Sequence, residues 1–192
     1  MSRRPRRVGI FGGTFDPPHV GHLSVVHDVA EALDLDEVTW IPAGRSPHKP
    51  DAPLTAGKTR SAMVRCVVSA DSRFSVDESE LVRAGLSYTV DTLERLASRR
   101  PGTDFFLIIG RDQYEAFDRW KAPDRIRSLA TVVVMDRDGR GGAISPDVAV
   151  PVGRVDVSAT GVRRRVRAGE SIRDLVPECV AAAIAEHRLY TS

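Results

Sequence analysis

The sequence has few of the features that would place a protein outside the ordinary globular classes. Only two of its 192 residues are cysteine, and aromatic residues make up 6%. Its longest apolar runs, residues 105–109 and 131–135, fall far short of the ~20 residues that cross a bilayer. Positive and negative charges nearly cancel, leaving a formal net charge of +2. These scarcities predict a globular protein with no membrane span and no nucleic-acid partner.

The two cysteines and the first residues exclude further classes of protein. Cys66 and Cys179 have no partner at metal or redox spacing, so we expect two small buried hydrophobic side chains without chemistry of their own. The basic start precedes only the short apolar run 8–11, too little for a signal peptide. We therefore expect a cytoplasmic protein with one domain, residues 1–192.

Short strand-like runs alternate with helical stretches along the chain. The expected strands are residues 7–11, 37–42, 73–77, 105–109 and 131–135. The expected helices are residues 59–70, 88–99 and 112–117, after a first helix with apolar residues at steps of three and four from Val20 to Leu33. This alternation predicts a Rossmann-like open α/β sheet, mainly parallel, with helices on both faces. Ligands then bind beyond the carboxyl ends of the strands.

The first expected strand runs directly into GGTFDPPHVGH, residues 12–22. The paired glycines permit dihedrals closed to other residues and let a ligand reach the backbone. Asp16 and the two prolines after it predict a cap and a preset first turn of a helix. His19 and His22 then lie on one side of its positive end, with Gly21 leaving room for a nucleotide. The segment predicts a phosphate site at a helix N-terminus.

Two other glycine motifs are excluded by their spacing. The dinucleotide fingerprint G-x-G-x-x-G is absent, because the early glycines fall at positions 9, 12 and 13. The stretch AGKTR resembles part of a P-loop, but Ala52 stands where that loop needs its first glycine. We therefore interpret Lys58 as a solvated helix residue.

A second candidate phosphate site lies far downstream in VSATGVRRRV, residues 157–166. Either Ser158 or Thr160 can cap a helix there. Arg163 falls near the first turn of that helix, where its guanidinium can meet a triphosphate. The following arginines are expected on the solvated face.

These two segments resemble the signature motifs of the HxGH nucleotidyltransferase superfamily, although Ala159 replaces the middle serine of the second motif. The resemblance implies a Rossmann-like fold and transfer of a nucleotidyl group from a nucleoside triphosphate, with Mg²⁺ bound to ATP and no metal ligand from protein side chains. It implies three catalytic residues: His19, His22 and Arg163. It implies an ATP site made of Gly12, Gly13, Thr14, Phe15, Gly110, Asp112, Ser158 and Thr160.

Three further stretches, SPHKP, SYTVDTL and IIGRDQYEAFDRW, extend the resemblance to the bacterial nicotinate mononucleotide adenylyltransferases over nearly the whole chain. It implies that ATP and nicotinate mononucleotide are the substrates. It places His48 and Lys49 near phosphates, and Thr89 and Trp120 around the pyridine ring. Arg111 departs from the family, which usually has a small residue there.

Several alternatives remain open at the level of sequence. Ser87 or Thr89 can cap the helix that follows them, and Asp112 can cap its own. Trp120 can be a half-exposed packing residue. Phosphopantetheine adenylyltransferases share both motifs, and a non-catalytic nucleotide sensor could use the same fold. The oligomeric state is also open, a homo-oligomer included.

Overall fold

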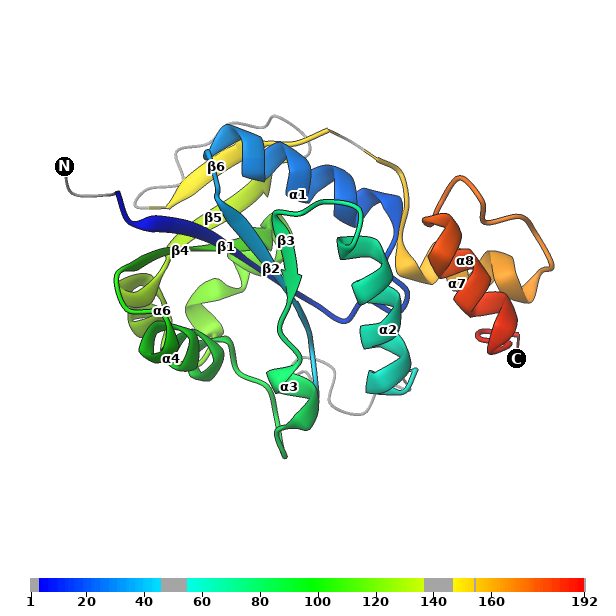
Figure 1. Cartoon of the computed structure of the whole chain (residues 1–192), viewed down its shortest axis with the longest axis horizontal. Coiled ribbons are helices and arrows are strands. Elements are labelled where there is room, and N and C mark those ends of the chain that lie inside the picture. The colour runs from blue at the N-terminus through cyan, green and yellow to red at the C-terminus, as the bar shows by residue number, and fades with distance from the viewer. Residues whose placement is uncertain (1–3, 46–54, 137–146, 154, 192) are drawn as a thin grey trace.

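The structure is a computed structural model that describes residues 4–45, 55–136, 147–153 and 155–191. Within these ranges one open sheet has the strand order β3-β2-β1-β4-β5-β6 (Figure 1). All its ladders are parallel, which confirms the predicted fold class. The strands are β1 (Arg6–Gly13), β2 (Glu37–Pro42), β3 (Phe74–Val76), β4 (Thr103–Gly110), β5 (Thr131–Asp136) and β6 (Val148–Pro151).

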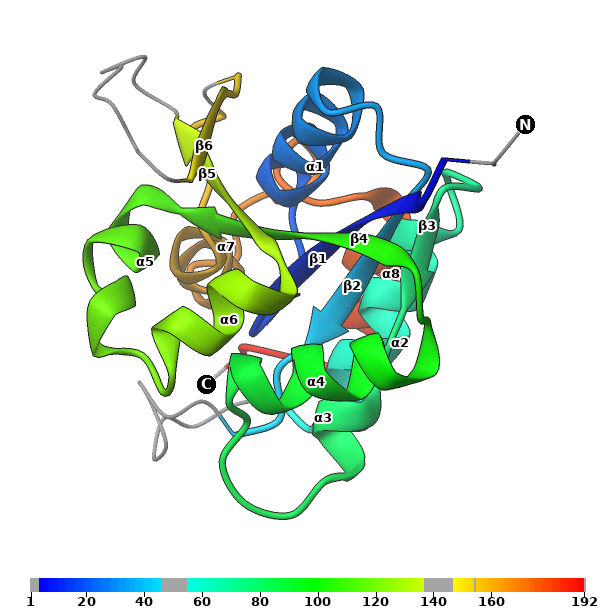
Figure 2. The same ribbon diagram turned by 90° about the vertical axis from the view of Figure 1, so that its left-hand side faces the viewer.

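Helices cover both faces of this sheet (Figures 1 and 2). One face packs against α1 (Val20–Ala32), α2 (Gly57–Val68), α7 (Ala159–Arg167) and α8 (Glu178–Glu186). The other packs against α4 (Thr89–Arg99), α6 (Pro123–Leu129) and the 3₁₀ helix η1 (Phe117–Arg119). The remaining helices are α3 (Ser79–Val82) and α5 (Arg111–Glu115). No described helix is both long enough and apolar enough to cross a membrane.

The central strands are apolar on both faces because both faces are buried. Successive residues of β1 show the division: Ile10 packs into the core under α4 and α6, and Phe11 into the core under α1 and α2. The strand therefore reads as a continuous apolar run, not as an alternation, which is why its sequence predicted a strand buried on both sides.

Some elements were not predicted. β6 has only four residues and follows residues 137–146, which lie outside the described ranges, as does most of the proline-rich stretch 42–53. α3, η1 and α6 span three to seven residues, too short for helical periodicity to show. The predicted helices are right in type and within a few residues at their ends.

The prediction for the cysteines is wrong. Cys66 of α2 and Cys179 of α8 form a disulfide, with their Cα atoms 6.3 Å apart. Cys66 is half-buried and Cys179 is exposed, so neither is a buried hydrophobic residue. The packing of α2 against α8 brings the two together across 113 residues of sequence, a pairing that spacing rules do not address.

Candidate active site

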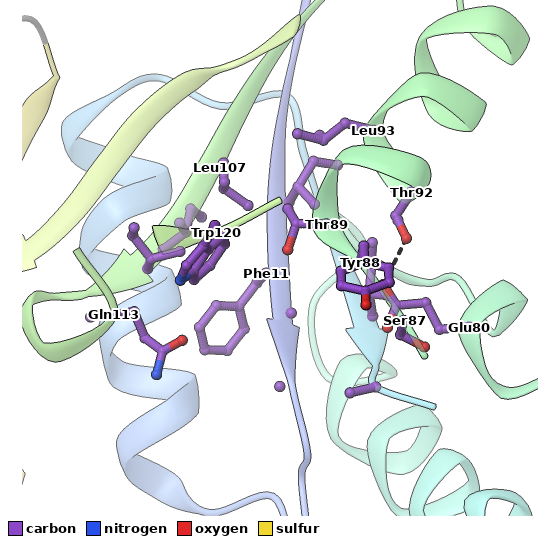
Figure 3. A pocket seen from close by; sticks show the side chains of 18 of the residues that line it. Phe11, Glu80, Ser87, Tyr88, Thr89, Thr92, Leu93, Leu107, Gln113 and Trp120 are labelled. Carbon is purple, nitrogen blue, oxygen red and sulfur yellow. Dashed lines mark hydrogen bonds between the residues drawn. The ribbon is translucent and has the colours of Figure 1, made fainter. Parts of the chain in front are cut away.

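A cavity of about 580 Å³ opens at the carboxyl ends of β1 and β4 (Figure 3). The chain crosses from one side of the sheet to the other between these two strands, which is where ligands bind in open parallel sheets. Its walls come from the end of β1, the end of β4, the start of α4 and the segment 110–121. Residues of the first motif and of the stretches SYTVDTL and IIGRDQYEAFDRW therefore meet at one cavity.

The turn after β1 forms the cavity floor with residues 12–15. The approach of a ligand to the backbone of Gly12 and Gly13 stays a prediction. The other reason predicted for these glycines, dihedrals closed to other residues, is wrong, since neither has a positive φ and both lie in β1. Space is the constraint instead, because a Cβ on Gly13 would lie 2.8 Å from the ring of Phe15. Phe15 itself has φ +49°, a left-handed conformation that costs about 1–2 kcal/mol outside glycine. Neighbouring groups must hold this turn in place.

Asp16 does not cap the helix as predicted. The N-cap of α1 is His19, and the buried Asp16 carboxylate accepts hydrogen bonds from the Tyr190 hydroxyl (2.6 Å) and the Thr55 backbone N–H (3.2 Å). Burial, followed by this bond to Asp16, raises the pKa of Tyr190, so the phenol stays protonated as donor. Asp16 thereby ties the turn after β1 to the end of the chain.

His19 and His22 lie at the start of α1, as predicted, with their rings stacked 3.6 Å apart. The His19 backbone N–H donates to His22 Nδ1 at 3.1 Å. Nδ1 is therefore unprotonated, and the proton of the neutral ring is on Nε2. Edge contacts with Phe11 and Phe15 fix the orientation of this ring. His22 lines the cavity and can present Nε2–H to a ligand, whereas His19 is buried behind it.

Gly21 has a different role from the one predicted. A Cβ there would lie 2.8 Å from Val157 and 3.2 Å from the His19 ring. The segment before α7 thus fills the space beside Gly21. The absence of a side chain on Gly21 lets this segment approach the start of α1. The prediction that this space receives a nucleotide is wrong.

The helix predicted around residue 163 is α7, and its cap is Ser158, whose hydroxyl accepts from the Gly161 N–H at 3.1 Å. Thr160 instead accepts from Arg163 Nη2 at 3.1 Å. Arg163 Nη1 donates to the backbone carbonyl of Asp16 at 2.7 Å, so α7 is attached to the turn that follows β1. These side chains stand next to the cavity without lining it.

Gly110 and Asp112 line the cavity at the end of β4. Gly110 is the N-cap of α5 and no side chain caps that helix, so the capping alternative for Asp112 is wrong. A Cβ on Gly110 would lie 2.7 Å from Asp112 Oδ1, and the glycine therefore gives this carboxylate its place. The unusual Arg111 faces the buried Asp136 at the end of β5, 3.5 Å away.

The far end of the cavity is aromatic. Trp120 packs on Phe117 with ring centroids 5.3 Å apart and lines one wall, and Tyr88 and Thr89 line the opposite wall (Figure 3). Tyr88 is the N-cap of α4 without a side-chain hydrogen bond, so neither Ser87 nor Thr89 caps this helix. Aromatic side chains therefore lie on both sides of this end of the cavity.

Comparison with known proteins identifies the family. A family model described as cytidylyltransferase-like matches residues 10–165. The chain belongs to this family.

Two curated relatives of the chain bear the name "Probable nicotinate-nucleotide adenylyltransferase". The chain is 40% identical over 186 residues to the one from Shouchella clausii, covering 96% of this chain and 97% of the relative. It is 44% identical over 191 residues to the one from Salinibacter ruber, covering 95% and 97%. These matches confirm the resemblance on which the predicted site residues depend.

A solved structure of Plasmodium falciparum nicotinic acid mononucleotide adenylyltransferase complexed with NaAD has the same fold. The TM-score is 0.79 at 17% identity, over 97% of this chain and 98% of that one. At this identity the likeness concerns the fold alone.

The structure places in the cavity wall most of the site residues that the family resemblance predicts. Those that line it are Gly12, Gly13, Thr14, Phe15, His22, Thr89, Gly110, Asp112 and Trp120. Those beside it are His19, Ser158, Thr160 and Arg163. His48 and Lys49 lie outside the described residues.

Other lining residues were missed by the sequence reasoning. They include Ala43, Glu80, Tyr88, Thr92, Gln113 and Lys121. Glu80 accepts a hydrogen bond from the buried Thr92 hydroxyl at 2.7 Å, which joins α3 to α4 at the cavity wall. Tyr88 and Thr92 fall in SYTVDTL and Gln113 falls in IIGRDQYEAFDRW, two stretches that the sequence had singled out, and their place there was the available signal.

Proposed function

We propose that this protein transfers the adenylyl group of ATP to nicotinate mononucleotide, giving nicotinate adenine dinucleotide and pyrophosphate, in NAD biosynthesis. The observation that carries the proposal is the continuity of one cavity, from a histidine donor at the start of α1 to an aromatic slot at Trp120. The names of the curated relatives agree with it. Two anionic substrates can thus meet end to end in this cavity.

The reaction joins two phosphates, so the site needs alignment and positive charge more than a base. A phosphomonoester has its second pKa near 6, and the attacking oxygen is already ionised at neutral pH. That oxygen attacks the α-phosphorus of ATP, its new P–O bond replaces the bond to the β-phosphate bridge, and pyrophosphate leaves. We assign no covalent enzyme intermediate, because the motifs contain no nucleophile with an activating base. Transfer in a single in-line displacement should then invert the configuration at phosphorus.

We assign the donors as follows. His22 Nε2–H and the backbone amides of residues 12–15 donate to oxygens of the transferring phosphate, where charge builds up. His19 holds the His22 ring, and Arg163 and Lys49 contribute further positive charge to the polyphosphate. Gly110 and Asp112 flank the adenosine ribose, and Ser158 and Thr160 set the start of α7 toward ATP.

Mg²⁺ fits this site as a partner of ATP. The described residues contain no group of three or more His, Cys, Asp or Glu side chains placed to hold a metal. Magnesium commonly binds through substrate phosphates and water with few protein ligands, so such a cage is not required. When bound, it offsets the negative charge of the triphosphate.

An acceptor panel tests the proposal. The purified protein is incubated with Mg²⁺, ATP and one of three acceptors: nicotinate mononucleotide, nicotinamide mononucleotide or phosphopantetheine. Pyrophosphate and the dinucleotide product are then measured. We expect the highest kcat/KM with nicotinate mononucleotide. Faster turnover of phosphopantetheine, or ATP binding without turnover of any acceptor, would overturn the assignment.

A further inference from the structure

We propose that Arg60 of α2 is a positioning residue for adenylyl transfer, because it holds the Thr14 carbonyl of the phosphate-binding turn and ties it to the carbonyls of Ala43 and Thr55 in two neighbouring segments. The inference rests on the proposed function and deepens it. Arg60 belongs to neither of the two motifs, and it does not itself line the cavity. Its role is to hold the turn that does.

The contacts of Arg60 are unusual for a buried cation. Its side chain is 3% exposed, yet its donors go to backbone carbonyls: Nη1 to Thr14 (2.7 Å), Nη2 to Ala43 (2.8 Å) and Nε to Thr55 (2.9 Å). Thr14 follows β1 and Ala43 follows β2, and both line the cavity. One guanidinium thus joins the ends of two adjacent strands to α2.

The bond to Thr14 determines which way the next amide faces. The Thr14–Phe15 peptide is trans, and in a planar trans peptide the C=O and N–H point in opposite directions. When the carbonyl is held on Arg60, the Phe15 N–H must point away from α2. Phe15 is also the residue in the left-handed conformation, which does not persist without support. Arg60 supplies that support from behind the turn.

The charge around Arg60 explains why an arginine is needed. The titratable groups that face it are Asp16, from the loop after β1, and Tyr190, from the end of the chain. Burial lowers the pKa of Arg60 and Asp16 opposes this, but a guanidinium stays charged throughout. It also presents a planar fork with donors in three directions, which an ammonium cannot reproduce.

A purely structural role would affect stability alone, whereas a positioning role affects the chemical step. A displacement of about 1 Å in a reacting group can cost about 10²-fold in rate. Thr89 and Trp120 have no bond to Arg60, so binding of the pyridine nucleotide should be spared. The expected signature is a large loss of kcat with a nearly constant KM for nicotinate mononucleotide.

The first experiment compares Arg60→Gln and Arg60→Lys with Arg65→Gln as the matched control. Arg65 is on the same helix but exposed, and it pairs with Glu78 at 2.9 Å. We expect kcat to fall about 10²-fold in Arg60→Gln and about 10-fold in Arg60→Lys, at saturating substrates. The control should stay within about twofold of the wild type. Wild-type kcat in both Arg60 variants, with folding verified by circular dichroism, overturns the proposal.

The pH dependence of Arg60→Lys gives a second readout. A buried amine has a depressed pKa, because burial disfavours its charged form. The ratio of variant to wild-type kcat should therefore be highest at low pH and fall as the pH rises. In Arg60→Gln, which does not titrate, the ratio should stay constant. A constant ratio in Arg60→Lys would count against a charged clamp, even if Arg60→Gln fails to fold.

Hydrogen exchange provides a readout that is independent of turnover. A non-hydrolysable ATP analogue should protect the peptide that covers residues 12–16 in the wild type and in Arg65→Gln. Arg60→Lys should lose most of this protection, while the unliganded exchange of α1 and α4 stays unchanged. Equal protection of this peptide in the wild type and in Arg60→Lys overturns the proposal. If the wild type instead binds the analogue but turns over no mononucleotide, the proposed function fails and this result still decides the role of Arg60.

Discussion

The two ends of the central strands use polar groups in opposite ways. At the amino ends, charged side chains satisfy one another: Arg4 donates to Asp36 at 2.9 Å, and the buried Glu37 pairs with Arg100 and Arg6 at 3.0 Å each. At the carboxyl ends, His22, Thr89 and residues 12–15 line a cavity. Charge that is paired within the fold supports stability, and donors directed at a cavity support ligand binding.

The pKa values at the amino end follow from this pairing. Burial acts to raise the pKa of Glu37, but hydrogen bonds from Ser75, Arg100 and Thr39 outweigh it, and the net pKa lies below 4.5. The pKa of Asp36 is also lowered, first by the backbone N–H of Arg7. Both carboxylates are therefore held ionised at neutral pH. Substitutions at the two ends should separate stability from catalysis.

The largest effect is expected for His22→Ala at the carboxyl end. Loss of one donor made mainly in the transition state should lower kcat by about 10²- to 10³-fold. ATP binding should weaken much less, because the ground state uses other donors. Steady-state kinetics and titration with an ATP analogue measure the two effects. Normal turnover with weakened ATP affinity would show that His22 acts only in binding.

The next effect concerns the end of the cavity at Trp120 and Thr89, where we propose that the pyridine ring binds. A carboxylate accepts from every donor, whereas an amide leaves some buried donors unpaired, at about 1–3 kcal/mol each. Two such mismatches predict a preference of about 10²-fold or more in kcat/KM for nicotinate over nicotinamide mononucleotide. Trp120→Ala should weaken both alike, since stacking barely distinguishes them. Equal values for the two substrates in the wild type would contradict an acid-selective slot.

A substitution that lies at neither end of the strands should affect only stability. Replacing Cys66 and Cys179 together by serine removes a link across 113 residues, and about 2–4 kcal/mol of unfolding free energy should be lost. Denaturant unfolding measures the loss, with kcat expected to stay within about twofold. A reductant should destabilise the wild type and leave the double variant unaffected. An equal response of both proteins would show that no disulfide forms.

The smallest effect is expected for Glu37→Gln at the amino end. The variant leaves its arginine and hydroxyl partners less well satisfied, and at neutral pH the unfolding free energy should fall by about 1–3 kcal/mol. The folded pKa of Glu37 is depressed, so its contribution is present above pH 4.5 and is lost as the pH falls through the folded value. Chemical denaturation at pH 7 and at acid pH measures the difference. A change in kcat would mean that the two ends are coupled.

Much of the fold could be predicted because its signals are local. The runs that became β1, β4 and β5 have continuous apolar cores, as is typical of strands buried on both faces. β2 also contains the buried polar residues Glu37 and Thr39. The alternation with helices then favoured a parallel sheet, and the resemblance carried by two motifs indicated the family. β6 was missed because four residues carry too little pattern.

The site could be predicted only in part. The positions of His19 and His22 followed from their spacing at the start of a helix, and both are correct. The roles of Asp16 and Gly21 were wrong, because each depends on a segment more than a hundred residues away, at Tyr190 and Val157 respectively. Sequence patterns over a few residues predict a helix cap or an open space. They do not predict which distant residues bind to that side chain or fill that space.

By itself the sequence determined the sheet and the glycine turn that leads into a helix. Only the tertiary structure decided that Cys66 pairs with Cys179 and that Arg60 holds the carbonyls of Thr14 and Ala43. The first group depends on residues a few positions apart, whose geometry a helix or strand repeats. The second depends on which of several compatible partners the packed chain brings within bonding distance, and no local period encodes that choice.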